Sequence, residues 1–151
     1  MIGTGDQISD VLLKTDEGTP LSLSDFKGRS VALFFVGKTI TQSTEMLFEE
    51  LAKRLEQFLN LDISPLIISG ESAAQLAAYR NKKDVPFVLL SDERFKFHTE
   101  LGYGKPGAPT FLLIDNNSVV IDMVPFLPPV EQVSVAEERA LKLSSKKEVM
   151  C

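Results

Sequence analysis

This sequence offers a single imidazole and a single thiol for chemistry at a site. There is one histidine, His98, and one cysteine, Cys151, the last residue. Ser43 would need a neighbouring base to act as a nucleophile, and the short helix expected around His98 is not expected to reach it. One histidine and one cysteine do not form the cluster of ligands that a structural or catalytic zinc needs. The sequence therefore predicts no metal site and no cofactor.

Cys151 is the only candidate for redox chemistry. Peroxide reduction and disulfide exchange both require a thiolate, because a protonated thiol or a hydroxyl is a far weaker nucleophile. A single cysteine also excludes a disulfide within the chain. We expect Cys151 to be an exposed free thiol, able to join two chains through an adventitious disulfide.

The elements that must position any site follow an alternating order. Apolar runs predict buried strands at 31–36 and 65–69, and each is followed by a helical pattern, at 42–59 and 72–81. A hairpin within 8–23 precedes them, and the segments that follow are a strand at 87–90, a short helix at 93–101, strands at 110–114 and 119–124, and a helix at 130–144. This order predicts an α/β fold with a central mixed sheet and helices on both faces. We expect one domain over residues 1–151, with a hairpin extension at 1–28 and a flexible tail at 145–151.

Composition excludes several classes of function. The net charge is −5 and the pI is about 4.9, whereas broad nucleic-acid binding requires a basic face. No apolar run approaches the roughly 20 residues of a membrane span, and the beginning of the sequence has no pattern of a secretory signal. The expectation is a cytoplasmic protein that binds neither nucleic acid nor membrane.

Five short strings, in the right order, resemble the alkyl hydroperoxide reductase/thiol-specific antioxidant family, the peroxiredoxin form of the thioredoxin fold. They lie at residues 5–18, 21–28, 68–72, 86–92 and 107–115. The resemblance covers about residues 2–124. It implies a three-layer thioredoxin-like sandwich and a thiol peroxidase or antioxidant activity.

The same resemblance places the active site where this chain lacks the reactive groups. The family motif is Pro, then Thr, then the peroxidatic Cys, with a Glu three residues later. Thr39 and Glu45 match the Thr and Glu, which puts Gln42 at the cysteine position. A register shifted by one residue would put Ser43 there, but the Thr position would then be an isoleucine. The active-site Arg of the family corresponds to Ala108, so both the Cys and the Arg are missing.

Ala108-Pro109 resembles the cis-proline site of thioredoxin-like proteins. The resemblance implies a cis peptide bond facing the loop of Thr39 and Gln42 across a shallow groove. A backbone left free at Ala108 would pair with an extended peptide. The partners left open are therefore a protein or peptide in this groove, or a second copy of the chain in a homodimer.

The favoured hypothesis is a non-catalytic binding or regulatory module that keeps the peroxiredoxin-like fold with a degenerate active site. The alternative is a thiol-dependent peroxidase whose loop cysteine is absent from this chain or replaced by Cys151. Fold alone does not decide between them.

Overall fold

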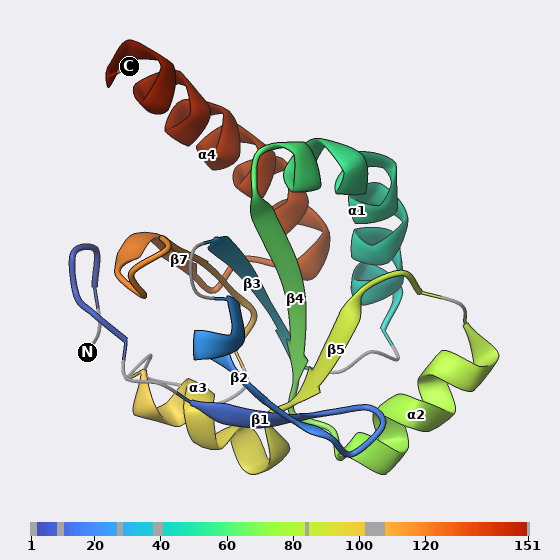
Figure 1. Cartoon of the computed structure of the whole chain (residues 1–151). Helices are drawn as coiled ribbons and strands as arrows, with labels where there is room; N and C mark the ends of the chain where they lie inside the picture. The colour runs from blue at the N-terminus through green and yellow to red at the C-terminus, as the bar shows by residue number, and fades with distance from the viewer. Residues whose placement is uncertain are drawn as a thin grey trace.

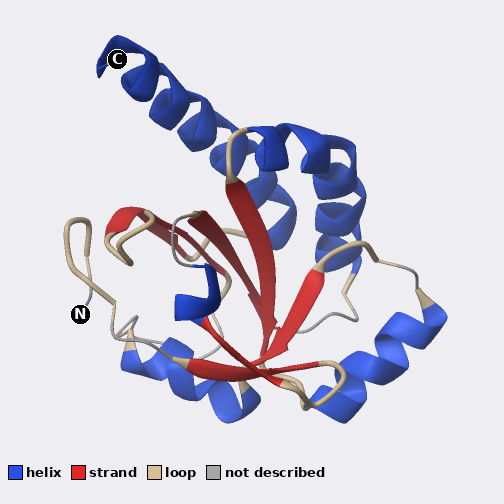
Figure 2. Ribbon diagram, in the orientation of Figure 1, coloured by secondary structure: helices blue, strands red, loops and turns tan. Residues whose placement is uncertain are grey.

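The structure is a computed structural model, and it describes residues 3–8, 11–26, 29–37, 41–83, 85–101 and 108–150. Side chains are described as far as Leu143. Seven strands form one mixed sheet in the order β2-β1-β5-β4-β3-β6-β7 (Figures 1 and 2). The strands are β1 (Leu12–Thr15), β2 (Pro20–Ser22), β3 (Ser30–Gly37), β4 (Ile63–Ser69), β5 (Val88–Ser91), β6 (Thr110–Ile114) and β7 (Val120–Pro125).

The centre of the sheet is β3, which lies between β4 and β6. It pairs parallel with β4, with Phe34 opposite Ile67, and antiparallel with β6, with Phe34 opposite Phe111. All three side chains are fully buried. An apolar run of this kind suits a strand that is covered on both faces, and the predicted central strands are confirmed.

Helices cover both faces of the sheet. The buried side chains of α1 (Gln42–Asn60), α2 (Ala73–Lys82) and α4 (Pro129–Met150) share one core cluster. On the other face, the 3-10 turn η1 (Leu23–Phe26), the β1–β2 hairpin and α3 (Lys96–Glu100) contribute to a second cluster. Figure 1 shows α1 and α4 side by side and α3 apart from them. The predicted α/β class and N-terminal hairpin are confirmed.

Two predicted helices differ in detail from those observed. The segment expected as one helix over 93–101 is a 3-10 turn, η2 (Glu93–Phe95), followed by α3. Arg94 and Phe95 have positive φ values of 62° and 56°, which no regular helix contains. The last helix continues past Ser144 to Met150, because the lysines and glutamate that follow are good helix formers.

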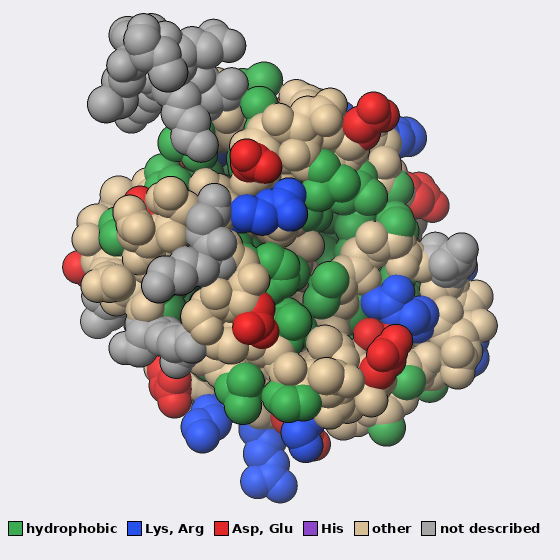
Figure 3. Space-filling model, in the orientation of Figure 1, with side chains coloured by type: hydrophobic (Ala, Val, Ile, Leu, Met, Phe, Trp, Pro, Cys, Tyr) green, Lys and Arg blue, Asp and Glu red, His purple; other side chains and the backbone are tan. Residues whose placement is uncertain are grey.

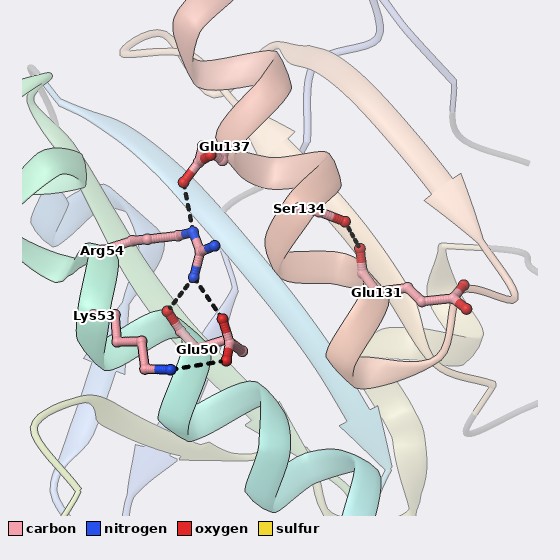
Figure 4. Close-up of polar contacts among 6 residues, drawn as sticks. All are labelled: Glu50, Lys53, Arg54, Glu131, Ser134 and Glu137. Atoms are coloured by element: carbon pink, nitrogen blue, oxygen red, sulfur yellow. Dashed lines mark hydrogen bonds and ion pairs between the residues drawn. The ribbon is translucent and has the colours of Figure 1, made fainter.

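Polar contacts join the two long helices on one face. Arg54 of α1 donates through Nε to Glu137 of α4 at 2.5 Å, and through Nη1 to Glu50 one turn earlier in α1 (Figure 4). The space-filling view shows acidic and basic side chains interspersed, with no broad basic patch on the face that it draws (Figure 3). Within the described helices, none is long and apolar enough to cross a membrane.

Candidate functional site

The position that the resemblance gives to the reactive cysteine lies at the beginning of α1. Thr41 is the N-cap, and its hydroxyl oxygen accepts a hydrogen bond from the Thr44 amide at 3.1 Å. Gln42 is the first helical residue, and its side chain is exposed. The unpaired N–H groups of a helix N-terminus favour a negative charge. The pKa of a thiol would be lowered at this position. The side-chain amide of Gln42 does not ionise at physiological pH and has no nucleophilic sulfur.

The neighbouring candidates on α1 have other partners. The Ser43 hydroxyl oxygen accepts a hydrogen bond from the backbone amide of Val130, at the beginning of α4, at 3.3 Å. Glu45 is half-buried and lines a cavity beside α2. Thr39 lies outside the described residues, as does Cys151. The described hydrogen bond of Ser43 thus links the beginning of α1 to the beginning of α4, and no base is among its described contacts.

Ala108 and Pro109 lie at the same end of the sheet as Gln42. β6 begins immediately after them at Thr110, which pairs with Phe35 near the end of β3. The prediction of a cis bond is wrong: no described peptide bond is cis, so Ala108–Pro109 is trans. The trans form of an X–Pro bond is the lower in energy by about 0.5–1 kcal/mol. In this structure the Pro109 carbonyl accepts a hydrogen bond from the Leu127 amide at 2.9 Å.

The backbone carbonyl of Ala108, which was expected to be free, is already engaged within the chain. Its carbonyl accepts a hydrogen bond from the Thr110 hydroxyl at 3.0 Å and from the ring of His98. Ala108 is buried. The strand-pairing mode of peptide capture therefore has no available acceptor at this residue.

A buried acid–histidine pair, which the sequence did not reveal, lies beside Ala108. Asp92 is 3% exposed and His98 is 1% exposed. The Asp92 carboxylate accepts from the backbone amides of Phe97 at 2.7 Å and His98 at 2.9 Å, which caps α3. The His98 ring packs against Phe35 with 5.3 Å between ring centroids. The left-handed residues Arg94 and Phe95 fold α3 back so that His98 comes to the end of β3.

Burial sets the protonation of this pair. It lowers the pKa of His98 below 6.5, opposed by the hydrogen bond to the Ala108 carbonyl and by the charge of Asp92. Burial also raises the pKa of Asp92 above 3.8, opposed by the two amide hydrogen bonds. The space beside the pair is about 10 Å³ and is lined by Gly37, Ser69 and Ala108, among others. That is about one water molecule, which leaves no room for an organic substrate.

We expect the free energy of unfolding to fall as the pH is lowered below about 6.5. The unfolded chain takes up a proton on His98 at a higher pH than the folded chain does, because the folded-state pKa is lowered. The slope is at most about 1.4 kcal/mol per pH unit for one proton. The raised pKa of Asp92 acts in the opposite direction at lower pH, since there the folded chain binds its proton first.

Denaturant melts of wild type and His98→Gln at pH 7.5 and 5.5 measure this effect. The loss of stability between the two pH values should be smaller in the variant, which cannot titrate at residue 98. Equal losses in the two proteins would show that another group is responsible.

Metal chemistry has no support in the described part of the chain. No group of three or more His, Cys, Asp or Glu side chains there could hold a metal ion. Those expected site residues that the structure describes fall into two groups, one on the first turn of α1 and one at the beginning of β6. The residues that the sequence missed, Asp92 and His98, lie beneath the second group.

Known proteins with similar sequences and folds agree with this architecture. The AhpC/TSA family matches residues 4–123. The chloroplastic peroxiredoxin Q of Sedum lineare is 36% identical over 114 residues, 72% of this chain and 61% of that protein. Peroxiredoxin Bcp of Bacillus subtilis is 30% identical over 95 residues, 63% of this chain and 60% of that protein. The chain thus spans about three fifths of the length of these curated relatives.

A solved structure shows the same fold over nearly the whole chain. The crystal structure of peroxidoxin BcpB from Mycobacterium tuberculosis matches with a TM-score of 0.83 and 22% identity, and the match covers 96% of this chain and 98% of that one. The peroxiredoxin form of the thioredoxin fold is therefore confirmed. The chain belongs to the AhpC/TSA family of peroxiredoxin-like proteins.

Proposed function

We propose that this protein is a non-catalytic binding or regulatory member of its peroxiredoxin-like family. The observation that carries the proposal is the exposed Gln42 amide at the N-terminus of α1, the place where a helix would stabilise a thiolate. No other residue of the loop or the helix supplies a thiol, because the only cysteine of the sequence is Cys151. A peroxide has nothing to oxidise at this position.

The missing arginine supports the same conclusion. Ala108 is buried beside His98, whose pKa is lowered, so the neighbourhood favours neutral groups. A guanidinium placed here without a thiolate partner would be an unpaired charge in a largely buried setting, which is costly. Loss of the cysteine and loss of the arginine are therefore mutually consistent.

The alternative is a thiol peroxidase, and the names of the relatives favour this function. Sequences at 30–36% identity carry the name peroxiredoxin. In this chain the reaction would have to use Cys151, because a thiolate must attack the peroxide oxygen and become a sulfenic acid. A second thiol would condense with the sulfenic acid to form a disulfide and release water, and a third thiol would exchange with that disulfide to return Cys151 to the thiol.

A peroxide-consumption assay with a thioredoxin or thiol reductant separates these functions. We expect wild type to consume hydrogen peroxide and alkyl hydroperoxides no faster than a free surface thiol does, and Cys151→Ser to abolish that residual rate. The matched variant Gln42→Cys places a thiol at the helix N-terminus, and its thiol should titrate at lower pH than that of Cys151 in a thiol-reagent assay. Turnover by wild type that survives Cys151→Ser would contradict the proposal.

Location and partners stay predictions. The cytoplasmic location is an expectation from the sequence alone. A protein or peptide partner at the edge formed by Gln42 and Pro109, or a second copy of the chain, remains proposed, but it would have to bind without the free Ala108 carbonyl.

A further inference from the structure

The small space beside the Asp92–His98 pair is closed toward solvent by one described side chain. Most of the described residues that line it are buried, and only Gly37, Gly70 and Phe95 are partly exposed. Glycines have no side chain, so the half-buried ring of Phe95 is the only described side chain on the open side of the space. This ring meets the His98 ring edge-on, with 6.5 Å between the ring centroids. Phe95 thus stands between the buried pair and solvent.

The Phe95 ring is packed on the backbone of Gly70, directly after β4. A Cβ atom at residue 70 would lie 2.9 Å from Cδ1 of Phe95 and nearer still to its Cε1 and Cζ, which is closer than real Cβ atoms approach other heavy atoms. The φ angle of Gly70 is not positive, so an alanine could adopt the same backbone conformation. The ring can therefore occupy this place only because residue 70 has no side chain, and an alanine there would displace the ring.

The backbone that carries this ring is strained. Arg94 and Phe95 are consecutive residues with φ values of 62° and 56°, in the left-handed region that is unfavourable for residues with a Cβ atom. Strain of this kind persists only where the surrounding structure holds it, and it gathers at segments that switch between conformations. The strained turn is therefore a candidate hinge, held in its present form by the contact of the ring with Gly70.

The residues on both sides of the hinge are fixed. The Asp92 amide donates to the Ser69 carbonyl at 2.7 Å, and the Asp92 carboxylate accepts the amides of Phe97 and His98. Between these fixed points, the Phe95 amide donates to the Asp92 carbonyl at 2.8 Å, which closes the turn. A change of backbone conformation confined to this turn would move the ring and leave the acid–histidine pair in place.

We propose that the Phe95 ring is a gate that controls the access of solvent and small solutes to the Asp92–His98 pair, with its hinge at Arg94 and Phe95. In the closed state, which is the one in the structure, the ring lies on Gly70 and shields the pair. In the open state the hinge relaxes, the ring turns away from Gly70, and the imidazole meets solvent and exchanges protons with it. The pair is then an acid–base group whose use depends on the position of one side chain.

This inference goes beyond the proposed function, because neither the gate nor the pair requires a thiol. It holds whether or not the chain reduces peroxides. Its test measures the reaction of His98 itself and does not depend on turnover, so its failure is distinguishable from a failure in the peroxide assay.

The reagent diethyl pyrocarbonate reports the opening of the gate. It transfers an ethoxycarbonyl group to a neutral imidazole nitrogen, with release of ethanol and carbon dioxide, and His98 is the only histidine of the chain. When the gate opens and closes faster than the reagent reacts, the rate of modification is proportional to the open fraction. We expect Gly70→Ala, whose added Cβ meets the Phe95 ring, to raise this rate about tenfold or more.

Two further variants test the gate and its hinge. Phe95→Ala removes the ring and should raise the rate at least as much as Gly70→Ala. Combined with Phe95→Ala, the Gly70→Ala substitution should have no further effect, because its Cβ then has no ring to displace. Arg94→Asn should lower the rate about threefold, because asparagine adopts the left-handed conformation more readily than arginine does and so stabilises the closed state.

Leu51→Ala is the control for global unfolding. Leu51 belongs to the core cluster on one face of the sheet, whereas Phe35, which packs on His98, belongs to the cluster on the opposite face. This substitution should lower the stability and leave the rate of modification unchanged. If Gly70→Ala does not fold, Phe95→Ala compared with Leu51→Ala makes the same test.

Three results would each overturn the proposal. One is a rate that is unchanged in Gly70→Ala or Phe95→Ala. Another is an effect of Gly70→Ala that is the same with and without the Phe95 ring. The last is an acceleration by Leu51→Ala as large as that by the gate variants, because His98 would then be reached by global unfolding.

Discussion

Leu51→Ala should lower the free energy of unfolding by about 3–5 kcal/mol. Leu51 is fully buried at the middle of α1, in the cluster that joins α1, the sheet and α4. Removing a buried leucine side chain loses its transfer free energy and leaves a cavity, and such substitutions cost 2–5 kcal/mol. We place this site in the upper part of the range because the sheet, including the fully buried Phe34, backs the cluster, so the neighbours have little freedom to collapse.

The control is Leu59→Ala on the same helix. Leu59 is 44% exposed, so the same substitution removes little buried area and should change stability by well under 1 kcal/mol. Urea melts of both variants measure the difference directly. A loss under about 0.5 kcal/mol for Leu51→Ala would mean that the buried face of α1 is assigned wrongly.

Arg80→Ala should destabilise the protein by about 2–4 kcal/mol. The Arg80 guanidinium donates to Asp16 Oδ2 at 2.6 Å, to the Val85 carbonyl at 2.8 Å and to the Phe87 carbonyl at 2.7 Å. It thereby joins the β1–β2 turn, which is distant in sequence, to α2 and to the chain leading into β5. Truncation would leave a mostly buried carboxylate and two carbonyls without their charged donor, and such losses cost about 1–3 kcal/mol each before water compensates in part.

Arg80→Lys provides the matched control. A lysine keeps the charge but cannot present the planar fork that reaches all three acceptors, so we expect about half of the loss to remain. Hydrogen exchange should report faster opening of the β1–β2 hairpin in Arg80→Ala than in Arg80→Lys. If the two variants are equally stable, the charge alone matters and the three-way geometry does not.

The parts of the fold that the sequence predicted are those with strong local patterns. The strand at 31–36 is a continuous apolar run, and β3 occupies Ser30–Gly37. The helix from Gln42 shows its apolar stripe in sequence, and Leu47 and Leu51 are fully buried. In both cases the periodicity of side chains along the chain is the same property that tertiary packing selects.

The parts that the sequence missed depend on contacts between distant segments. No local pattern signals that Arg80 reaches Asp16, or that left-handed Arg94 and Phe95 turn α3 so that His98 contacts Ala108. The Ala108–Pro109 bond is trans, and the local sequence does not distinguish the two isomers, because they differ by only about 0.5–1 kcal/mol and tertiary contacts select one of them. The chemistry of the site was nonetheless predictable, since the absence of a thiol is a property of composition.

The hydrogen bond between Ser43 and Val130 has a consequence for the motions of the molecule. The helix α4 lies beyond residues 4–123, the segment that matches the family, yet its first turn is bound to the first turn of α1, and Gln132 donates to the Phe35 carbonyl at 3.2 Å. We therefore expect the two helix ends and the end of β3 to open together and to exchange their amide protons as one cooperative unit. A fluctuation that opens the first turn of α1 would also break the Ser43–Val130 hydrogen bond, so we expect the time scale on which this turn becomes accessible to depend on the packing of the C-terminal helix.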